Sequence, residues 1–153
     1  MRVTLDTNIL IYLQNRYPRD IFTSLWDLIE AEALSGDACI CEAILDELER
    51  GGDDLPKWAK SLTSFVCPTS AEELATVKDI GDEYPGWVRE DKNAGDPFII
   101  AHGKAEDRIV VTDETPKGPN TADKNQKIPN IAANYGVSCY TFFEYMRARG
   151  WSF

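Results

Sequence analysis

The sequence has no long apolar run. Its uncharged apolar stretches, such as 98–101 and 109–111, are far shorter than the roughly 20 residues that cross a bilayer. The first ten residues carry Arg2 and Asp6 and show neither an extended apolar core nor a small-residue cleavage site, so no signal peptide is predicted. From these absences we expect a cytoplasmic protein with no membrane partner.

Histidine is almost missing, since His102 is the only one. A Ser-His-Asp or Cys-His mechanism would have to use it, and nothing in the sequence identifies a positioned partner. The four cysteines, Cys39, Cys41, Cys67 and Cys139, fall in or beside apolar runs, with no C-x-x-C pair and no neighbouring histidine. This pattern predicts reduced packing residues rather than a zinc site.

Basic residues are scarce, and the formal net charge is −10. Such a charge argues against tight nonspecific binding to nucleic acid, because that affinity depends largely on neutralising phosphates. The distribution is uneven. From Asp20 to Asp54 there are eleven acids and one base, Arg50, whereas from Asp96 onward there are seven of each. The acidic stretch predicts a surface that attracts a basic partner segment and repels RNA.

The 153 residues, 43% of them hydrophobic, are enough for one domain spanning 1–153. Short apolar runs at 3–5, 38–41, 65–67, 109–112 and 137–140 predict strands. Helical patterns cover 7–13, 21–34, 42–50, 55–62 and 71–84, and further helices begin at Asp96, after the 115–126 loop and at Phe142. Strands that alternate with helices in this way predict the α/β class, with a parallel sheet covered on both faces.

Acidic residues follow two of the predicted strands. Asp6 follows the first strand, the pair Asp113 and Glu114 follows the fourth, and two more acids, Glu47 and Asp96, lie on helices that could border the same edge. Sites in open parallel sheets form at the carboxyl ends of the strands. Clustered carboxylates repel one another unless a cation such as Mg²⁺ or Mn²⁺ neutralises them. Because Mg²⁺ leaves coordination positions open for phosphate and water, the cluster indicates phosphodiester hydrolysis.

Each acid also has a simpler interpretation. Asp6 and Asp96 could be helix caps, and the pair at 113–114 could be a solvated turn. Periodicity places Glu47 no closer to the site than the other acids of its helix. The rival function is therefore a binding module without catalysis, in which these acids are caps and surface charges. A phosphatase with an aspartate nucleophile is a weaker rival, because it needs a second acid where the chain has Asn8.

Several short motifs occur in an order that resembles the PIN-domain nucleases, which are mostly VapC-like toxins of bacterial and archaeal toxin–antitoxin modules. They are L-D-T-N at 5–8, E-L at 47–48, D-P-F-I-I-A at 96–101 and V-V-T-D-E at 110–114. The tail, with K-I-P at 127–129 and R-G-W-S-F at 149–153, resembles one branch of PIN-like proteins. The resemblance therefore covers essentially the whole chain.

This resemblance implies a three-layer α/β/α sandwich around a parallel sheet and a ribonuclease site that uses Mg²⁺ or Mn²⁺. Its implied catalytic residues are Asp6, Glu47, Asp96 and Glu114, supported by Asn8 and Thr112. Where the family commonly shows T-x-D, this chain has Glu114, with Asp113 one residue earlier. Both therefore remain candidate metal ligands beside Asp6 and Asp96.

The implied partners are an RNA substrate and a protein antitoxin with a basic segment, and a homodimer is compatible with the sequence. The loop at 115–126 and the residue after it supply three lysines, Lys117, Lys124 and Lys127. These could hold a substrate phosphate or simply be solvated. Lys127, which begins the K-I-P motif, is the residue that we expect to contact RNA.

Overall fold

Five parallel strands form the centre of the structure, a computed structural model that describes residues 1–89 and 93–153. They are β1 (Val3–Leu5), β2 (Ala38–Cys41), β3 (Val66–Cys67), β4 (Ile109–Val111) and β5 (Cys139–Tyr140), in the order β3-β2-β1-β4-β5. In the register Val3 pairs with both Ala38 and Ile109. The first strand in the chain therefore lies in the middle of the sheet.

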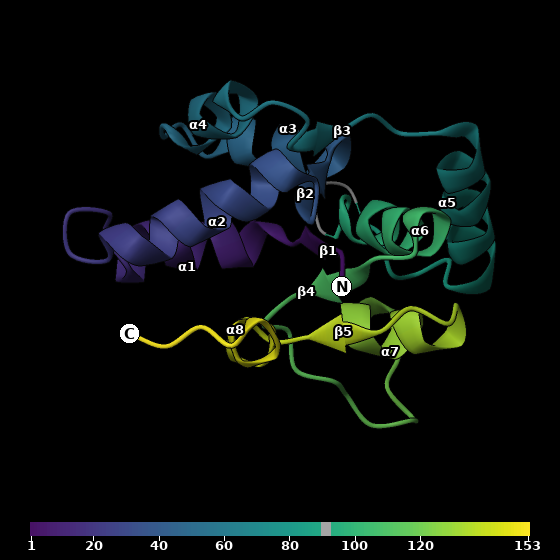
Figure 1. Ribbon diagram of the computed structural model, residues 1–153. Helices are drawn as coiled ribbons and strands as arrows, with labels where there is room; N and C mark the ends of the chain where they lie inside the picture. The colour runs from purple at the N-terminus through teal and green to yellow at the C-terminus, as the bar shows by residue number, and fades with distance from the viewer. Residues whose placement is uncertain (90–92) are drawn as a thin grey trace.

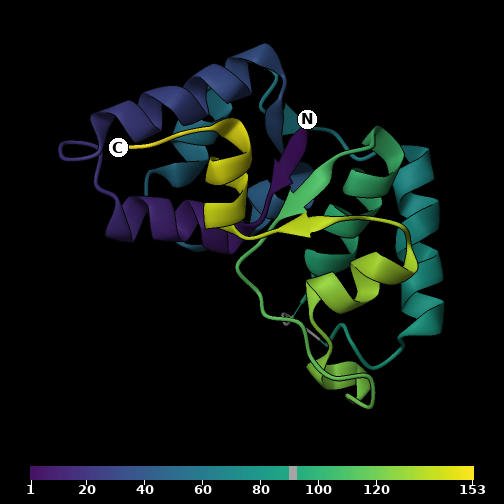
Figure 2. The same ribbon diagram turned by 60° about the horizontal axis from the view of Figure 1, so that its bottom comes forward.

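Helices cover both faces of this sheet. They are α1 (Thr7–Arg16), α2 (Thr23–Ser35), α3 (Glu42–Arg50), α4 (Leu55–Ser61), α5 (Ala71–Glu83), α6 (Asp96–Glu106), α7 (Ile128–Asn134) and α8 (Phe142–Arg149). Figure 1 shows their order along the chain, and Figure 2 shows α1, α2 and α8 on one side of the sheet with α5, α6 and α7 on the other. The predicted three-layer α/β/α architecture is confirmed.

The central strands are buried because helices pack on both of their faces. Every residue of β1 and β2 is buried, including Val3, Leu5 and Ile40. On the α6 side, Ile99 and Ile100 have no exposed surface. Burial of these side chains therefore holds α6 directly against the sheet. This packing determines where Asp96, the first residue of α6, lies. In the described part of the chain, no helix has the length and apolar character needed to span a membrane.

Of the two aspartates considered as helix caps, Asp6 and Asp96, the structure confirms only one. Asp6 is the N-cap of α1, and its Oδ1 accepts a hydrogen bond of 2.7 Å from the Thr7 amide, so the capping prediction is correct there. For α6, however, the cap residue is Gly95 and makes no side-chain cap, while Asp96 is already the first helical residue. The predicted helix start at Asp96 is therefore confirmed, but the simpler interpretation of Asp96 as the cap is wrong, and its carboxylate is left for another role.

The carboxyl ends of all five strands lie along one edge of the sheet, because every strand pair is parallel. Asp6 follows β1 at this edge, and Asp113 and Glu114 come shortly after the end of β4 at the same edge. Helix α3 follows β2 directly, and α6 precedes β4, so α6 runs back across the sheet from this edge. The fold therefore brings segments that are distant in the sequence to one place.

Candidate active site

Four carboxylates, from Asp6, Glu47, Asp96 and Glu114, come from four separate segments of the chain and act on one another electrostatically. Asp6 and Asp96 are only 4% and 8% exposed. Burial first, and then the charges of Glu114 and Glu47, raise the pKa of Asp6 to about 7, although hydrogen bonds from Thr112 and from the Thr7 amide act in the opposite direction. The sheet edge therefore holds a cluster of poorly solvated, mutually repelling acids.

Asp96 has the less compensated of the two buried carboxyl groups. Burial raises its pKa to about 8, and the charges of Asp6, Glu114 and Glu47 contribute in that order, while Lys127 lowers it. Among residues 1–89 and 93–153, no salt bridge includes any of the four acids. Such acids carry an energetic cost that a bound cation would relieve.

Asp6 is held in place by the side chain of Thr112. The Thr112 hydroxyl donates to Asp6 Oδ2 at 2.8 Å and accepts from Asn8 Nδ2 at 3.3 Å and from the Glu114 amide at 3.2 Å. One donor and two lone pairs are the full capacity of a hydroxyl group. Asn8 Oδ1 in turn accepts from the Asp113 amide at 3.4 Å. Asn8 and Thr112 therefore connect the ends of β1 and β4 around Asp6.

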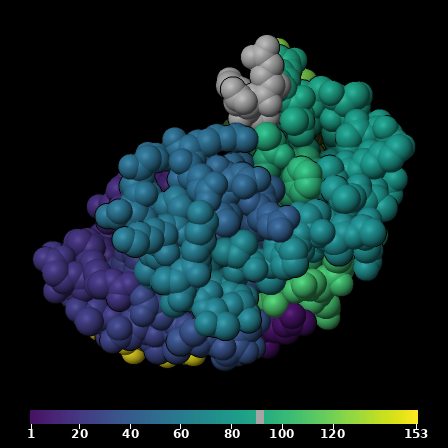
Figure 3. All heavy atoms as spheres, turned by 90° about the horizontal axis from the view of Figure 1, so that it is seen from above, coloured from purple at the N-terminus to yellow at the C-terminus, as the bar shows by residue number. Residues whose placement is uncertain are grey.

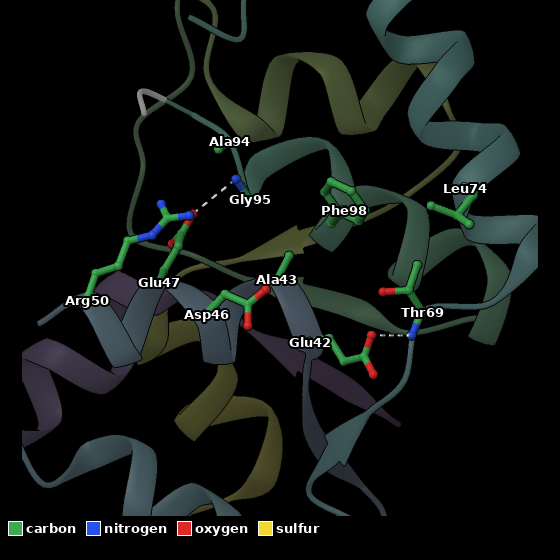
Figure 4. A pocket seen from close by; sticks show the side chains of 10 residues that line it. All are labelled: Glu42, Ala43, Asp46, Glu47, Arg50, Thr69, Leu74, Ala94, Gly95 and Phe98. Atoms are coloured by element: carbon green, nitrogen blue, oxygen red, sulfur yellow. Dashed lines mark hydrogen bonds between the residues drawn. The ribbon is translucent and has the colours of Figure 1, made fainter. Parts of the chain in front are cut away.

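Glu47 is the acid of α3 that reaches this cluster. Its Oε2 accepts a hydrogen bond from the Thr7 hydroxyl, and its Oε1 accepts one of 3.1 Å from the Gly95 amide. Figure 4 shows Glu47 pointing toward Gly95 at one end of a pocket of about 340 Å³, which Glu42 and Asp46 also line. Contacts with the residues that follow β1 and precede α6 thus distinguish Glu47 from the other acids of its helix.

Gly95 is required for this arrangement. A Cβ atom placed on it would lie 2.2 Å from Glu47 Oε1, so any side chain there would collide with the carboxylate in its present position. Neither Gly95 nor Thr7 is recognisable as a site residue from the sequence. The only available signals were that Thr7 follows a candidate ligand and that Gly95 precedes another, and neither pattern is specific.

The structure separates Asp113 from Glu114. Asp113 Oδ1 accepts a hydrogen bond of 2.9 Å from the Phe142 amide at the start of α8, and its side chain lines a different pocket with Tyr12 and Arg16. Glu114 instead accepts from the Ile128 amide at 2.7 Å and raises the pKa of both buried aspartates. Glu114 therefore joins the acidic cluster, while Asp113 anchors α8.

Three lysines lie on the segment that follows Glu114, and one of them, Lys127, acts on the cluster. A polar hollow of about 840 Å³ is lined by Lys117, Lys124 and Lys127, together with residues that include Asn93 and Gln126. No acid is among its lining residues in the described part of the chain. Since Lys127 lowers the pKa of Asp96, its positive charge acts on the acidic cluster itself. The hollow thus offers an anion a place next to the carboxylates.

The residues at the sheet edge suit a hard divalent cation. All four side chains offer oxygen, the ligand that Mg²⁺ and Mn²⁺ prefer. The carboxylates do not form the compact ligand group found elsewhere among the described residues, because hydrogen bonds hold Glu47 and Glu114 to neighbouring backbone amides. This spacing is compatible with Mg²⁺, which takes one or two carboxylates and keeps several waters.

Three solved structures share this fold. A VapBC2 structure from Rickettsia felis, bound to a DNA fragment from its promoter, aligns with a TM-score of 0.54 and 19% identity over 93% of this chain and 99% of the other. A FitAB structure bound to the DNA fragment IR36 aligns with a TM-score of 0.52 and 18% identity over 91% of this chain and 94% of the other. For VapBC-1 from nontypeable Haemophilus influenzae, the TM-score is 0.53 and the identity 17%, over 94% of this chain and 99% of the other.

These neighbours are PIN-domain structures, so the fold implied by the sequence motifs is confirmed. A search of curated proteins finds no significant match. The model of one sequence family, described as a domain of unknown function (DUF4411), matches residues 3–153. The chain, with its PIN-like α/β/α fold, therefore belongs to the DUF4411 family.

Proposed function

We propose that the protein is a metal-dependent endoribonuclease and the toxin component of a toxin–antitoxin module. The observation that supports this function most directly is the cluster of Asp6, Glu47, Asp96 and Glu114 at the carboxyl edge of the sheet, with two of its carboxyl groups buried and unpaired by any described cation. A protein rarely keeps such acids together without a functional reason. The PIN-like fold of the chain agrees with this assignment.

The metal site that we propose has Asp6 and Asp96 at its centre, with Glu114 and Glu47 beside them as ligands or as acceptors for metal-bound water. When bound, Mg²⁺ or Mn²⁺ supplies a Lewis acid and neutralises charge on the phosphodiester. Thr112 and Asn8 keep the Asp6 carboxylate oriented, and Gly95 and Thr7 do the same for Glu47. Asp113 is outside this proposed ligand set because the Phe142 amide holds it.

We place the RNA on the side of the lysine hollow. Lys127 is the described base whose charge acts on the buried acid Asp96, and Lys117 and Lys124 line the same hollow. A phosphate held there would lie next to the carboxylates, and these cations would offset part of the repulsion between RNA and a strongly acidic protein.

The proposed antitoxin binds the opposite kind of surface. The segment from Asp20 to Asp54 spans α2 and α3, and much of the face in Figure 3 belongs to it. Within this segment, Asp20, Asp27, Asp46 and Asp54 are exposed. Because the negative electrostatic potential of these acids attracts cationic peptides, we propose that a basic segment of the antitoxin docks on this face. The VapBC and FitAB structures, whose fold this chain shares, make a protein partner a natural expectation.

The function is tested by incubating single-stranded RNA with Mn²⁺ and either wild type, Asp96→Asn or the matched control Asp27→Asn. Asp27 is an exposed aspartate on α2, so its substitution makes the same charge change away from the cluster. We expect cleavage by wild type and Asp27→Asn, and its loss in Asp96→Asn and in EDTA. Equal cleavage by all three proteins would reveal a contaminating nuclease. Absence of cleavage, together with preserved binding of a basic peptide, would favour the binding module instead.

A further inference from the structure

A second group of potential metal ligands lies beneath α6, away from the acidic cluster. It consists of Cys39 on β2, Cys67 at the end of β3, and His102 and Glu106 on α6. One ligand atom from each of the four residues lies within 4.8 Å of all the others. Cys39 Sγ is 3.1 Å from His102 Nε2, which is 3.8 Å from Glu106 Oε2. The described chain contains no other grouping this compact.

The histidine is oriented by a buried carboxylate. Glu73 Oε1 lies 2.6 Å from His102 Nδ1, and both side chains are almost completely buried. The other oxygen of Glu73 accepts from the Ser70 amide at 3.0 Å in the capping box of α5, which fixes the carboxylate. When Nδ1 donates its proton to Glu73, Nε2 presents its lone pair toward the sulfur atoms. Histidine ligands of metals are typically held by a carboxylate in this way.

The spacing of these atoms is close to that of a tetrahedral site. Zinc bonds of about 2.3 Å to sulfur and 2.0–2.1 Å to nitrogen imply ligand atoms roughly 3.3–3.8 Å apart. The two separations from His102 Nε2, 3.1 and 3.8 Å, bracket that range, and all four ligand atoms lie within 4.8 Å of one another. Side-chain movements that bring the wider pairs closer would complete the geometry. Cys67 is half-buried and the Glu106 side chain is 36% exposed, which leaves a route from solvent for an ion.

The chemistry of the ligands favours a borderline or soft metal. Two thiols and an imidazole select zinc over magnesium. Hydrogen bonds with Cys39 and then with His102 lower the pKa of the Cys67 thiol below its ordinary value, whereas the contact with Cys67 and then burial raise the pKa of the Cys39 thiol. Since the thiolate is the form that binds metal, Cys67 is the ligand already favoured in that form, and Cys39 would lose its proton when the ion binds. Glu106 is the weakest of the four ligands, since its Oε2 also pairs with Arg108 at 2.8 Å. A water molecule could take its place.

We propose that Cys39, Cys67 and His102, with Glu106 or a water as the fourth ligand, bind one structural Zn²⁺ ion. The ion would link β2, the edge strand β3 and α6, and through Glu73 it would also involve α5. Strand β3 has only two residues and, among the described strands, pairs only with β2, so metal coordination there would stabilise a short edge strand. The proposal of this zinc site does not rest on the proposed ribonuclease activity.

The experiment uses reduced protein that has been stripped of metal and titrated with Co²⁺, a spectroscopic substitute for Zn²⁺. We expect one equivalent to bind with the visible bands of tetrahedral Co²⁺ and a thiolate charge-transfer band in the near ultraviolet, and Zn²⁺ to displace it. Added Zn²⁺ should also raise the melting temperature, because a ligand that binds only the folded state stabilises it.

Three variants locate the site. Cys67→Ser should lose the charge-transfer intensity of one thiolate and most of the affinity, whereas Cys139→Ser, another half-buried cysteine at a strand end, should bind Co²⁺ as wild type does. Glu73→Gln should weaken Co²⁺ binding by roughly 10- to 100-fold, as substitutions of such orienting partners typically do. Circular dichroism confirms that each variant is folded before it is compared.

The proposal is overturned if folded, reduced wild type shows no thiolate band with Co²⁺, or if the band is unchanged in folded Cys67→Ser. It is also overturned if Co²⁺ gives only weak octahedral bands that disappear in Asp96→Asn, because the ion would then be bound by the carboxylates. In that case the cysteines and the histidine form a hydrogen-bonded core cluster and no metal site.

Discussion

The buried carboxyl group of Asp96 should make the metal-free protein less stable as the pH rises. Its pKa of about 8 in the folded protein is far above the ordinary value of 3.8, so between these values the folded state binds more protons than the unfolded state. Stability must then fall with increasing pH across that window. Below about pH 4 both states are protonated and the penalty vanishes, whereas above about pH 8 it is complete.

Asp96→Asn removes the charge and retains nearly the same shape. Each pKa unit corresponds to about 1.4 kcal/mol, so the difference between 3.8 and about 8 sets a ceiling of about 6 kcal/mol on the penalty. Relaxation and water entry reduce such penalties in real proteins, and we expect about 2–4 kcal/mol. In EDTA at pH 8, the variant should therefore be more stable than wild type, and the advantage should shrink toward zero near pH 4.

Metal should reverse this order. A cation at one thousand times its dissociation constant stabilises the folded state by about 4.1 kcal/mol. Only wild type would gain this stabilisation, which exceeds the expected advantage of Asp96→Asn. Urea unfolding of wild type, Asp96→Asn and the exposed control Asp27→Asn, each in EDTA and in Mn²⁺ from about pH 4 to pH 8, measures both effects. If Asp96→Asn is less stable than wild type in EDTA at pH 8, or if Mn²⁺ leaves the order unchanged, the reasoning is refuted.

Three further predictions concern residues around the cluster. Gly95→Ala should displace Glu47 and so lower the affinity for Mn²⁺ measured by calorimetry, and an unchanged affinity would contradict this role for Gly95. The free energy of unfolding in EDTA should change by less than about 1 kcal/mol, because the φ of −83° at Gly95 suits alanine. Glu114→Gln should abolish RNA cleavage and Asp113→Asn should retain it, so equal rates for the two variants would exclude our choice of the fourth acid. Lys127→Ala should weaken RNA binding and reduce the steepness of log affinity against log salt concentration by about one, while the affinity for Mn²⁺ stays the same. An unchanged slope would show that Lys127 does not contact RNA.

Much of the architecture was predictable because the controlling signals are local. Apolar runs bounded by helices gave all five strands close to their observed positions, and parallel pairing then required that Asp6 and the residues after β4 share one edge. The choice between Asp113 and Glu114 was not predictable. It depends on the Phe142 and Ile128 amides, which lie 29 and 14 residues further along the chain and reach the site only in the folded protein.

The cysteine and histidine cluster shows a different limit of sequence reasoning. The absence of a C-x-x-C pair and of a nearby histidine predicted packing cysteines, but spacing along the chain says little when each ligand lies on a separate element. Register decides the outcome here: Cys41 pairs with Cys67, and Cys39, two residues earlier, faces the same side of the sheet because strand side chains alternate. A two-residue edge strand carries too little pattern to reveal its register beforehand.

Helix α6 connects the two sites. Asp96 is its first residue and His102 lies six residues later, about 9 Å along the helix axis. The acidic cluster offers only oxygen ligands, whereas the cysteine and histidine cluster offers sulfur and nitrogen. Ligand chemistry, rather than affinity alone, would therefore direct a hard metal ion to the first site and a borderline metal ion to the second. Because α6 is one rigid element, an ion at His102 would fix its depth on the sheet, and with it the position of Asp96. Loss of zinc should therefore loosen the acidic cluster without removing any of its ligands.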